Sequence, residues 1–499
     1  IRHLVFRRGY DSRKKADIQL VYTVDVELPG ALEAALRKRF RRDVHIAATP
    51  DTRYRYVAAP GSFAAGTPRP VVIGCGPCGI LAALILAQMG LKPIILERGK
   101  VVRERTQDTW GFWRRRELNT ESNVQFGEGG AGTFSDGKLW TQVKDPKHYG
   151  RKVLEEFVKA GAPEEILYVS KPHIGTFRLV KMVEHIRATI ESLGGEFRFQ
   201  HKVVDLVLEE QTNAADPART RRIRGVVLDN GETLTADQVI LAIGHSARDT
   251  FKMLHERGVY IEPKPFSIGF RIEHPQGLID RARFGPNAGN AILGAADYKL
   301  VHHASNGRAV YSFCMCPGGT VVAATSEEGR VVTNGMSQYS RNERNANAGV
   351  VVGIEPADFP ADMQNPLGGI DFQRHWESRA YELGGGNYNA PGQLVGDFVA
   401  GRASTAFGSV EPSFKPGVHL TDLATALPDY AVVAMREALP AFDKTIPGFF
   451  MPDAVLTAVE TRTSSPIRIK RRDDDLQSLN VAGLYPAGEG AGYAGGIMS

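Results

Sequence analysis

Residues 71–97 read VVIGCGPCGILAALILAQMGLKPIILE. Within them Gly74, Gly76 and Gly79 form a G-x-G-x-x-G motif that follows an apolar, strand-like run. A segment of helix-forming residues, 80–89, comes next, and a second strand-like run ends at Glu97. Strand, glycines, helix, strand and acid in this order predict a βαβ unit that binds a dinucleotide. A glycine-rich turn without a ligand is the alternative.

Each part of this unit has a physical role. Gly74 permits the tight turn, Gly76 lets the backbone approach a pyrophosphate, and Gly79 lets the helix pack on the strand. The helix N-terminus offers free N–H groups and the positive end of a dipole to the phosphates. Glu97 follows at the end of the second strand, where its carboxylate can accept hydrogen bonds from ribose hydroxyls.

The length and composition of the chain are those of a globular protein. Its 499 residues are enough for two or three domains with sizeable cores. The longest clean apolar run, 80–87, is far too short to span a membrane, so we predict no membrane segment. No secretory signal is visible. The sequence begins with Ile1, so we expect residues upstream of it, and a targeting segment there stays open.

The four cysteines occur as two close pairs, Cys75/Cys78 and Cys314/Cys316. They are too few for a disulfide framework and favour a reducing, cytoplasmic setting. Cys75 and Cys78 form a C-x-x-C, which is a redox motif in other proteins. Here both occupy the x positions of the glycine motif, which favours a packing role for them.

Positive charge is concentrated at the N-terminus. Residues 1–56 carry 13 Lys and Arg against 7 Asp and Glu, whereas the remaining residues carry 48 against 49. Such an excess is typical either of a solvated basic face or of a site for an anionic partner such as nucleic acid.

Residues 1–57 are predicted to form a small α/β domain of the ferredoxin-like kind. Apolar and polar residues alternate over 17–28, which is typical of a half-buried strand. Leu32 and Leu36 suit one face of a short helix. Residues 58–69 are rich in Pro, Gly, Ala and Ser and predict a linker.

Residues 70–262 are predicted to be the first part of the dinucleotide-binding domain. Segments 151–160 and 179–193 have helical patterns, and 197–244 has the pattern of strands. Within the strands, Asn230-Gly231 separates two β-prone runs and predicts a two-residue hairpin.

Residues 263–455 differ in sequence pattern from the segment before them and predict an inserted α+β substrate domain. Its expected strands are 266–272, 308–313 and 320–324. Residues 456–499 are predicted to return to the dinucleotide-binding domain as its last part, with a final strand at 479–487.

Three separated pieces point to one class of protein: residues 71–97, Ile240–His245 and Gly488-Glu489-Gly490. Together they resemble the two-dinucleotide-binding-fold flavoproteins, whose Rossmann-like, glutathione-reductase-type α/β domain binds FAD. Those proteins usually have Thr where this chain has Ile243, and Asp where it has Glu489. The Gly-Glu form is similar to the subgroup that includes the flavoproteins of tRNA wobble-uridine modification.

The resemblance covers nearly the whole chain. It is to bacterial FAD-dependent oxidoreductases known as NAD(FAD)-utilising dehydrogenases, and it implies FAD while leaving the substrate open. The stretches that carry it are 126–139, 171–178, 240–250, 461–469 and 483–498.

The resemblance and the glycine pattern together imply a set of FAD-binding residues. The glycines of 127–132 let the backbone pass close to a flat ring. We expect Gly495-Gly496 to start a helix that faces the flavin and continues beyond Ser499, so that the last domain is truncated here. The predicted set is Gly74, Gly76, Pro77, Cys78, Gly79, Glu97, Arg98, Gly129, Gly130, Ala131, Gly132, Thr133, Val203, Ala242, Gly244, Gly488, Glu489, Gly495, Gly496 and Ile497.

Candidates for catalysis are fewer. Cys314 and Cys316 follow a predicted strand and precede a Pro-Gly-Gly turn, where a thiol could face the flavin; buried structural thiols are the alternative. Tyr493 is the candidate to cover the flavin ring. Arg462 and the basic run 470–472 suit either an anionic group or a solvated surface. No histidine has the company of other metal-ligating residues, so we predict no metal site.

These observations predict an FAD-dependent oxidoreductase that moves hydride or electrons between FAD and a small-molecule substrate. No second G-x-G-x-x-G unit follows, so NAD(P)H is expected only as a transient reductant at the flavin face. Two alternatives stay open: a flavoprotein linked to RNA binding or modification, and a non-catalytic flavin-binding sensor or scaffold. The sequence leaves the oligomeric state open.

Overall fold

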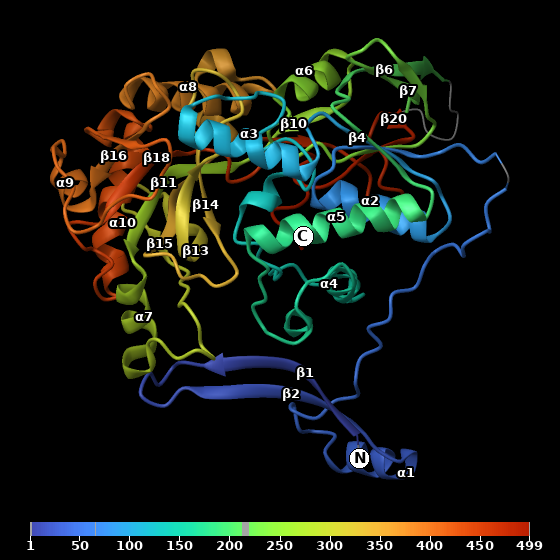
Figure 1. Cartoon of the computed structure of the whole chain (residues 1–499), viewed down its shortest axis with the longest axis horizontal. Coiled ribbons are helices and arrows are strands. Elements are labelled where there is room, and N and C mark those ends of the chain that lie inside the picture. The colour runs from blue at the N-terminus through green and yellow to red at the C-terminus, as the bar shows by residue number, and fades with distance from the viewer. Residues whose placement is uncertain (1, 65, 212–218, 499) are drawn as a thin grey trace.

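The computed structural model describes residues 2–64, 66–211 and 219–498. Within them, two large sheets lie beside one another, and a small N-terminal unit lies apart from both (Figure 1). The first is a parallel five-stranded sheet in the order β21-β9-β3-β4-β5. Its strands are β3 Val71–Ile73, β4 Ile94–Glu97, β5 Glu196–Phe199, β9 Val239–Leu241 and β21 Leu484–Pro486. The predicted α/β class with a parallel sheet is confirmed.

The two faces of this sheet pack against different elements because side chains alternate along each strand. Val72 shares a core with helices α2 (Pro77–Gln88) and α5 (Thr176–Ser192). Its neighbours Val71 and Ile73 share the opposite core with a small sheet and helix α6. These elements are β6 Val203–Glu210, β7 Arg221–Leu228, β8 Thr233–Thr235, β20 Val481–Ala482 and α6 Arg248–Glu256.

Local sequence signals describe this unit well. The predicted βαβ unit is confirmed, since β3, α2 and β4 follow in order and the strands pair in parallel. A hairpin forms around Asn230-Gly231, but its predicted two-residue loop is wrong: Val227 pairs with Thr233 and Leu228 N donates to Glu232 O at 2.8 Å, which leaves a three-residue loop, 229–231. Helices α4 (Tyr149–Lys159) and α5 are the predicted helices. The single strand predicted over 479–487 is wrong. Gly483, with φ +78°, turns the chain between β20 and β21, which lie in different sheets.

The second large sheet has eight strands in the order β12-β13-β15-β11-β18-β16-β17, with β14 paired to β13. Its pairs are antiparallel except that of β16 with β17. β18 lies inside this sheet, although it falls past the predicted boundary at residue 455. The strands are β11 Phe266–Pro275, β12 Val301–His303, β13 Ala309–Ala323, β14 Thr333–Ser337, β15 Asn345–Ile354, β16 Ala390–Leu394, β17 Val418–Leu420 and β18 Val455–Glu460.

We call the parallel sheet with its covering elements the first unit, and the eight-stranded sheet with its helices the second unit. Helices complete the second unit and join it to the first. Its own helices are α7 Gln276–Phe284, α8 Gly368–Leu383, α9 Val395–Ala400 and α10 Asp429–Asp443. Helix α3 (Val102–Arg115) follows β4 in the chain, yet its Phe112 and Trp113 are buried in the core of the second unit. The Trp113 indole N–H donates to Ala323 O at 2.9 Å. Strand β10 (Ile261–Pro263) pairs with β19 (Ile467–Ile469) where the chain passes between the units.

The N-terminal unit is an antiparallel ribbon of β1 (Arg2–Asp11) and β2 (Gln19–Glu27), followed by α1 (Gly30–Arg39). The strand predicted over 17–28 is present, but its apolar face is not buried: Leu20 and Val26 are 39% and 47% exposed. The helix has no buried residue to cover that face. The ribbon meets the rest of the chain at its tip, where Tyr10 packs edge-on against Phe284. A nucleic-acid partner for this basic segment stays a prediction.

None of the helices in the described ranges is long and apolar enough to cross a membrane.

Candidate cofactor-binding site

A cavity of about 1230 Å³ lies between the two units. The carboxyl ends of the parallel strands form one side of it: Gly74 follows β3, Glu97 ends β4, Ala242 follows β9 and Ala487 follows β21. Residues of β13 and the segment after β18 form the other side. The carboxyl edge of a parallel sheet is where α/β proteins bind ligands, because the strand ends leave a crevice there.

The glycine motif shapes one end of the cavity. Gly74 has φ +101°, and a Cβ on it would lie 2.3 Å from Ala242 O. A Cβ on Gly79 would lie 1.9 Å from Gly74 O, so the helix packs on the strand at a distance that only glycine allows. Gly76 is the N-cap of α2 and offers no capping side chain, which leaves first-turn N–H groups for a ligand.

The reasons that require glycine at positions 74 and 79 do not apply at Gly76. Its φ is −79°, a value open to other residues, and a Cβ on it would meet nothing nearer than Gly130 Cα at 3.7 Å. Neither the backbone conformation nor neighbouring protein atoms therefore require glycine here. The absence of a side chain leaves room at the start of α2 for a ligand to approach the backbone.

The Glu97 carboxylate is buried at the end of β4 and accepts three backbone hydrogen bonds. Oε2 accepts from Cys75 N at 2.8 Å, and Oε1 accepts from Gly99 N and Gly127 N at 2.9 Å each. A carboxylate has about four lone-pair positions, so one remains open on the cavity side. Glu97 thus fixes the loops around the motif and keeps one acceptor for a ligand hydroxyl.

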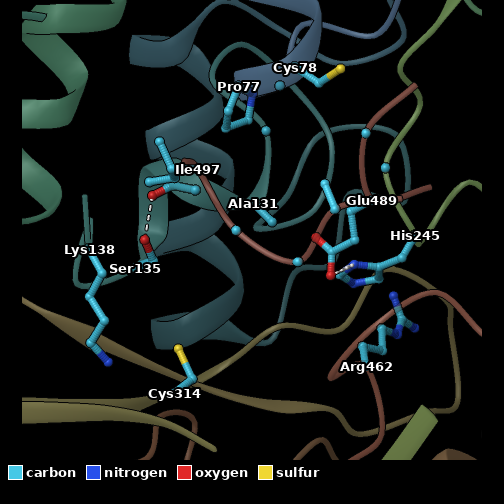
Figure 2. A pocket seen from close by; sticks show the side chains of 18 of the residues that line it. Pro77, Cys78, Ala131, Ser135, Lys138, His245, Cys314, Arg462, Glu489 and Ile497 are labelled. Atoms are coloured by element: carbon cyan, nitrogen blue, oxygen red, sulfur yellow. Dashed lines mark hydrogen bonds and ion pairs between the residues drawn. The ribbon is translucent and has the colours of Figure 1, made fainter. Parts of the chain in front are cut away.

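The segment after β21 brings a second carboxylate into the cavity. Glu489 Oε1 lies 3.4 Å from His245 Nδ1, and Figure 2 shows both side chains in the same part of the wall. Gly488, with φ +72°, packs against α2, where a Cβ would lie 2.9 Å from the Cys78 Cβ. Residues far apart in sequence therefore meet here at the start of α2.

Most of the predicted cofactor residues come together in this wall. The lining includes Gly74, Gly76, Pro77, Cys78, Glu97, Arg98, Gly130, Ala131, Gly132, Val203, Ala242, Gly244, Gly488, Glu489, Gly495, Gly496 and Ile497. The other three residues of the predicted set, Gly79, Gly129 and Thr133, belong to the described ranges but do not line the cavity. Gly129 N donates to Cys75 O at 2.8 Å, which holds the glycine-rich loop against the motif.

Two arginines that suited an anionic ligand already have protein partners. Arg98 binds Glu121 at 2.6 Å and Asp249 at 2.8 Å, and it stacks on Phe126. Arg462, expected either to bind an anion or to lie on a solvated surface, is buried and pairs with Glu377 at 3.0 Å. Burial is the largest influence on the Arg462 guanidinium and lowers its pKa.

The far end of the cavity holds Cys314 and Lys138, whose side chains point toward the same space in Figure 2. The predicted Pro-Gly-Gly turn after Cys316 is wrong. The segment continues as strand β13, whose register against β15 shifts twice, between Phe313 and Cys316 and again between Cys316 and Gly319. Two successive β-bulges replace the turn and kink the strand beside the cavity.

Tyr493 also lines the cavity, but its ring is covered by the Arg471 guanidinium, 3.9 Å from the ring centre. Its hydroxyl accepts from Arg471 N at 3.0 Å. The prediction that it covers a flavin stays open. In the other cysteine pair Cys75 is buried and Cys78 is half-buried, and both line the cavity. Burial raises the pKa of Cys75 and raises that of Cys78 to about 11. Thiols that stay protonated suit packing better than redox chemistry.

The sequence analysis does not predict two residues that help to form the site. Lys138 lines the cavity, and its signal is a lysine directly after a glycine-rich loop. Arg271, 0% exposed, lies outside the cavity lining and pairs at 2.6 Å with Glu460, which lines the cavity. Its signal is a single arginine within an apolar strand pattern, which needs a buried acid as partner.

Comparisons with known proteins agree on one family. A family model described as "FAD-dependent protein, C-terminal domain-like" matches residues 265–463. The chain is 47% identical over 500 residues to a protein of Clostridium beijerinckii (strain ATCC 51743 / NCIMB 8052) described as uncharacterized, with 99% of this chain and 89% of the relative covered. The chain belongs to this family of FAD-dependent proteins.

Similar solved structures include CtdE in complex with FAD, at 12% identity and a TM-score of 0.30, covering 85% of this chain and 78% of that one. The L-amino acid deaminase from Proteus vulgaris matches at 14% identity and a TM-score of 0.27, covering 52% and 63%. Scores this low support no conclusion about the site or the reaction.

The residues present in the cavity fit FAD. Gly76 leaves open space in the wall at the start of α2, and Glu97, whose carboxylate is bonded to Cys75 N, lines the same cavity. Uncapped N–H groups of α2 face the phosphates of a dinucleotide bound in this way.

Proposed function

We propose that the cavity binds FAD and that the protein is an FAD-dependent oxidoreductase. The observation that carries the proposal is the convergence on one cavity of residues from three segments distant in sequence: 74–78 of the motif, 130–132 of the glycine-rich loop, and 488–489 with 493–497 near the end of the chain. In this arrangement the first segment holds the ADP half of FAD, and the other two hold the flavin half. FAD supplies the capacity to accept and donate two electrons.

The chain's own residues position the cofactor and shape its surroundings. The backbone at Gly76 and the first turn of α2 bind the pyrophosphate, and the Glu97 carboxylate accepts a hydrogen bond from a ribose hydroxyl. The Glu489 carboxylate accepts hydrogen bonds from the hydroxyls of the ribityl chain, and its contact with His245 orients it. The second unit closes the opposite side and provides the wall at which a substrate meets the flavin.

Electrons reach the flavin from NADH or NADPH in this proposal. A transient nicotinamide site at the flavin face suffices for this, because reduction needs only a brief encounter. The substrate is a small molecule that enters from the side of the second unit.

The test begins with the purified protein. Flavin that co-purifies or binds on reconstitution supports the first half of the proposal, and its bleaching during anaerobic titration with NADH or NADPH supports the second. Protein that binds no FAD would refute the whole proposal. Bound FAD that neither nicotinamide reduces would contradict the reductant and favour a non-catalytic flavin binder.

A matched pair of variants locates the site. Gly76→Ala places a methyl group where the protein leaves room, so we expect a folded chain with weakened FAD binding. Gly353→Ala adds the same methyl group in β15, where a Cβ meets no atom within 4 Å and which lies outside the cavity wall. We expect it to bind FAD as the unmodified protein does. Equal binding by both variants would place the cofactor elsewhere.

A further inference from the structure

We propose that Cys314 and Cys316 form a redox-active dithiol that exchanges two electrons with the flavin. The inference rests on the proposed function, because it takes the cavity to hold FAD, and it adds a second redox centre to that site.

The backbone of β13 brings the two thiols together. In a regular strand, residues i and i+2 are about 6.6 Å apart along the chain and their side chains stand parallel. Here the first bulge falls between Phe313 and Cys316, and Cys314 has φ +42°, a left-handed value that costs free energy in any residue but glycine. As a result, the Cys316 thiol turns back toward Cys314 and donates to Cys314 O at 3.4 Å.

The position of each thiol suits a different role. Cys314 is half-buried and lines the cavity, so its sulfur can meet the flavin or a substrate. Cys316 is buried directly behind it. In such a pair the thiol that can be reached from the cavity forms the first bond with a reactant. The buried thiol then displaces that reactant by forming the disulfide.

Two cations surround the pair. The Lys138 ammonium donates to Met315 O, between the cysteines, and the Arg271 guanidinium donates to Cys314 O at 2.9 Å. Positive charge stabilises a thiolate and so makes it a better nucleophile. The neighbouring Cys316 thiol and these cations hold the pKa of Cys314 well below its usual range, whereas the neighbouring Cys314 and burial raise the pKa of Cys316.

The acids nearby are already engaged by cations. Glu460 is held by Arg271 at 2.6 Å, and Asp136 pairs with the Arg341 guanidinium at 2.9 Å. The negative charge of a Cys314 thiolate is therefore not opposed by an unpaired carboxylate among these neighbours.

The exchange balances as a two-electron reaction. Oxidation starts from the Cys314 thiolate and the Cys316 thiol. It breaks the Cys316 S–H bond, forms one Cys314–Cys316 S–S bond, and gives two electrons and one proton to the oxidised flavin, which becomes the anionic reduced flavin. In the reverse direction, two electrons and one proton from the reduced flavin break the S–S bond and restore the thiolate and the thiol. The flavin is the only co-reactant that the step requires.

The first experiment uses the chain's own second cysteine pair as a control. The folded protein is equilibrated without oxygen in glutathione buffers from fully reduced to fully oxidised. It is then quenched with acid, denatured, alkylated with N-ethylmaleimide, digested and analysed by mass spectrometry. Under oxidising buffers we expect the peptide with Cys314 and Cys316 to carry no alkyl groups and to be two hydrogens lighter than the dithiol peptide. The peptide with Cys75 and Cys78 should be alkylated at both cysteines in every buffer, because burial keeps those thiols protonated and unreactive during the equilibration.

The second experiment counts electrons. Anaerobic titration with dithionite should reduce the oxidised wild-type holoprotein with four electrons per flavin, and the Cys314→Ser/Cys316→Ser variant with two. A Cys314/Cys316 peptide that never forms the disulfide in folded protein would overturn this inference alone. A disulfide that forms while wild type takes up only two electrons per flavin would overturn the exchange. Protein without flavin would instead refute the proposed function.

Discussion

Replacing Glu97 by glutamine tests how one buried carboxylate serves both the fold and the cofactor. Glutamine has the same shape, but its amide nitrogen cannot accept a hydrogen bond. Oε1 accepts from two backbone N–H groups and Oε2 from one, so the less costly rotamer places the nitrogen at the Oε2 position. Only Cys75 N–H then loses its partner, and a buried donor left unpaired costs about 1–3 kcal/mol. We expect the FAD-free variant to be destabilised by about this amount.

The loss of FAD affinity has a separate source. In the proposed complex, the open lone pair of Glu97 accepts from a ribose hydroxyl, and the amide nitrogen of Gln now stands beside that position. A hydrogen bond to a charged group contributes about 1.5–3 kcal/mol. At about 1.4 kcal/mol per factor of ten, the dissociation constant should rise about 10- to 150-fold.

The assay measures both quantities on the same protein. Urea unfolding of the flavin-free chain gives the stability, and quenching of flavin fluorescence on reconstitution gives the affinity. Glu196→Gln is the control, because Glu196 lies on the neighbouring strand β5, pairs with Arg69 and Arg198, and is outside the cavity wall. It should bind FAD within about threefold of wild type. A folded Glu97→Gln protein that does the same would refute the role given to Glu97.

Three further predictions concern the fold. Glu460→Gln leaves the Arg271 guanidinium buried without its acid, so urea unfolding should show a loss of about 3–5 kcal/mol in the free energy of unfolding. The double variant Arg271→Met/Glu460→Leu removes both charges and should recover most of this loss. A double variant as unstable as Glu460→Gln would contradict the pairing. Gly79→Ala places a Cβ 1.9 Å from Gly74 O and should abolish soluble expression or FAD binding, and full retention of both would refute the close packing of α2. Burial lowers the pKa of His274 to about 4, so the protonated imidazole favours the unfolded state, and stability present above pH 6.5 should be lost as pH falls toward 4. His274→Gln should flatten this loss in acid-unfolding curves, while the exposed His255→Gln should not.

The parts of the molecule that the sequence predicts well are those fixed by neighbours in the chain. Gly74, Gly76 and Gly79 lie within six residues of one another, and the position of the hairpin between β7 and β8 is marked by Asn230-Gly231, although its loop has three residues rather than two. In such cases the backbone conformation that glycine allows is enough to place a turn. Most of the residues predicted to bind the cofactor line one cavity, because each of their segments carries its own glycine pattern.

The parts that were wrong depend on partners far away in the chain. The Pro-Gly-Gly segment after Cys316 looks like a turn, but pairing with both β14 and β15 keeps it in the sheet and turns the extra residues into bulges. The alternating strand 17–28 predicts a buried face, but burial needs a covering element, and the described ranges place none over it. Periodicity shows which face is apolar and not what it meets.

The buried charges at the junction explain how two separately folded sheets can form one site. Arg248 begins α6 in the first unit and binds Glu377 of α8 in the second at 2.7 Å, and Arg462 binds the same carboxylate at 3.0 Å. The two guanidinium groups lower the pKa of Glu377, although burial alone would raise it.

Separating the units would break the bidentate hydrogen bonds between Arg248 of the first unit and Glu377 of the second, which lie in a buried junction. The network therefore disfavours hinge opening between the units. Flavin chemistry gains from such rigidity, because electron transfer needs a fixed distance between the ring and its reactant. If the Cys314 thiol, presented by β13 of the second unit, reacts with a flavin held by the first, then Glu377 helps to set the separation between them. Glu377→Gln should then slow the thiol–flavin exchange more than it weakens FAD binding, and equal effects on both would show that the network serves folding alone.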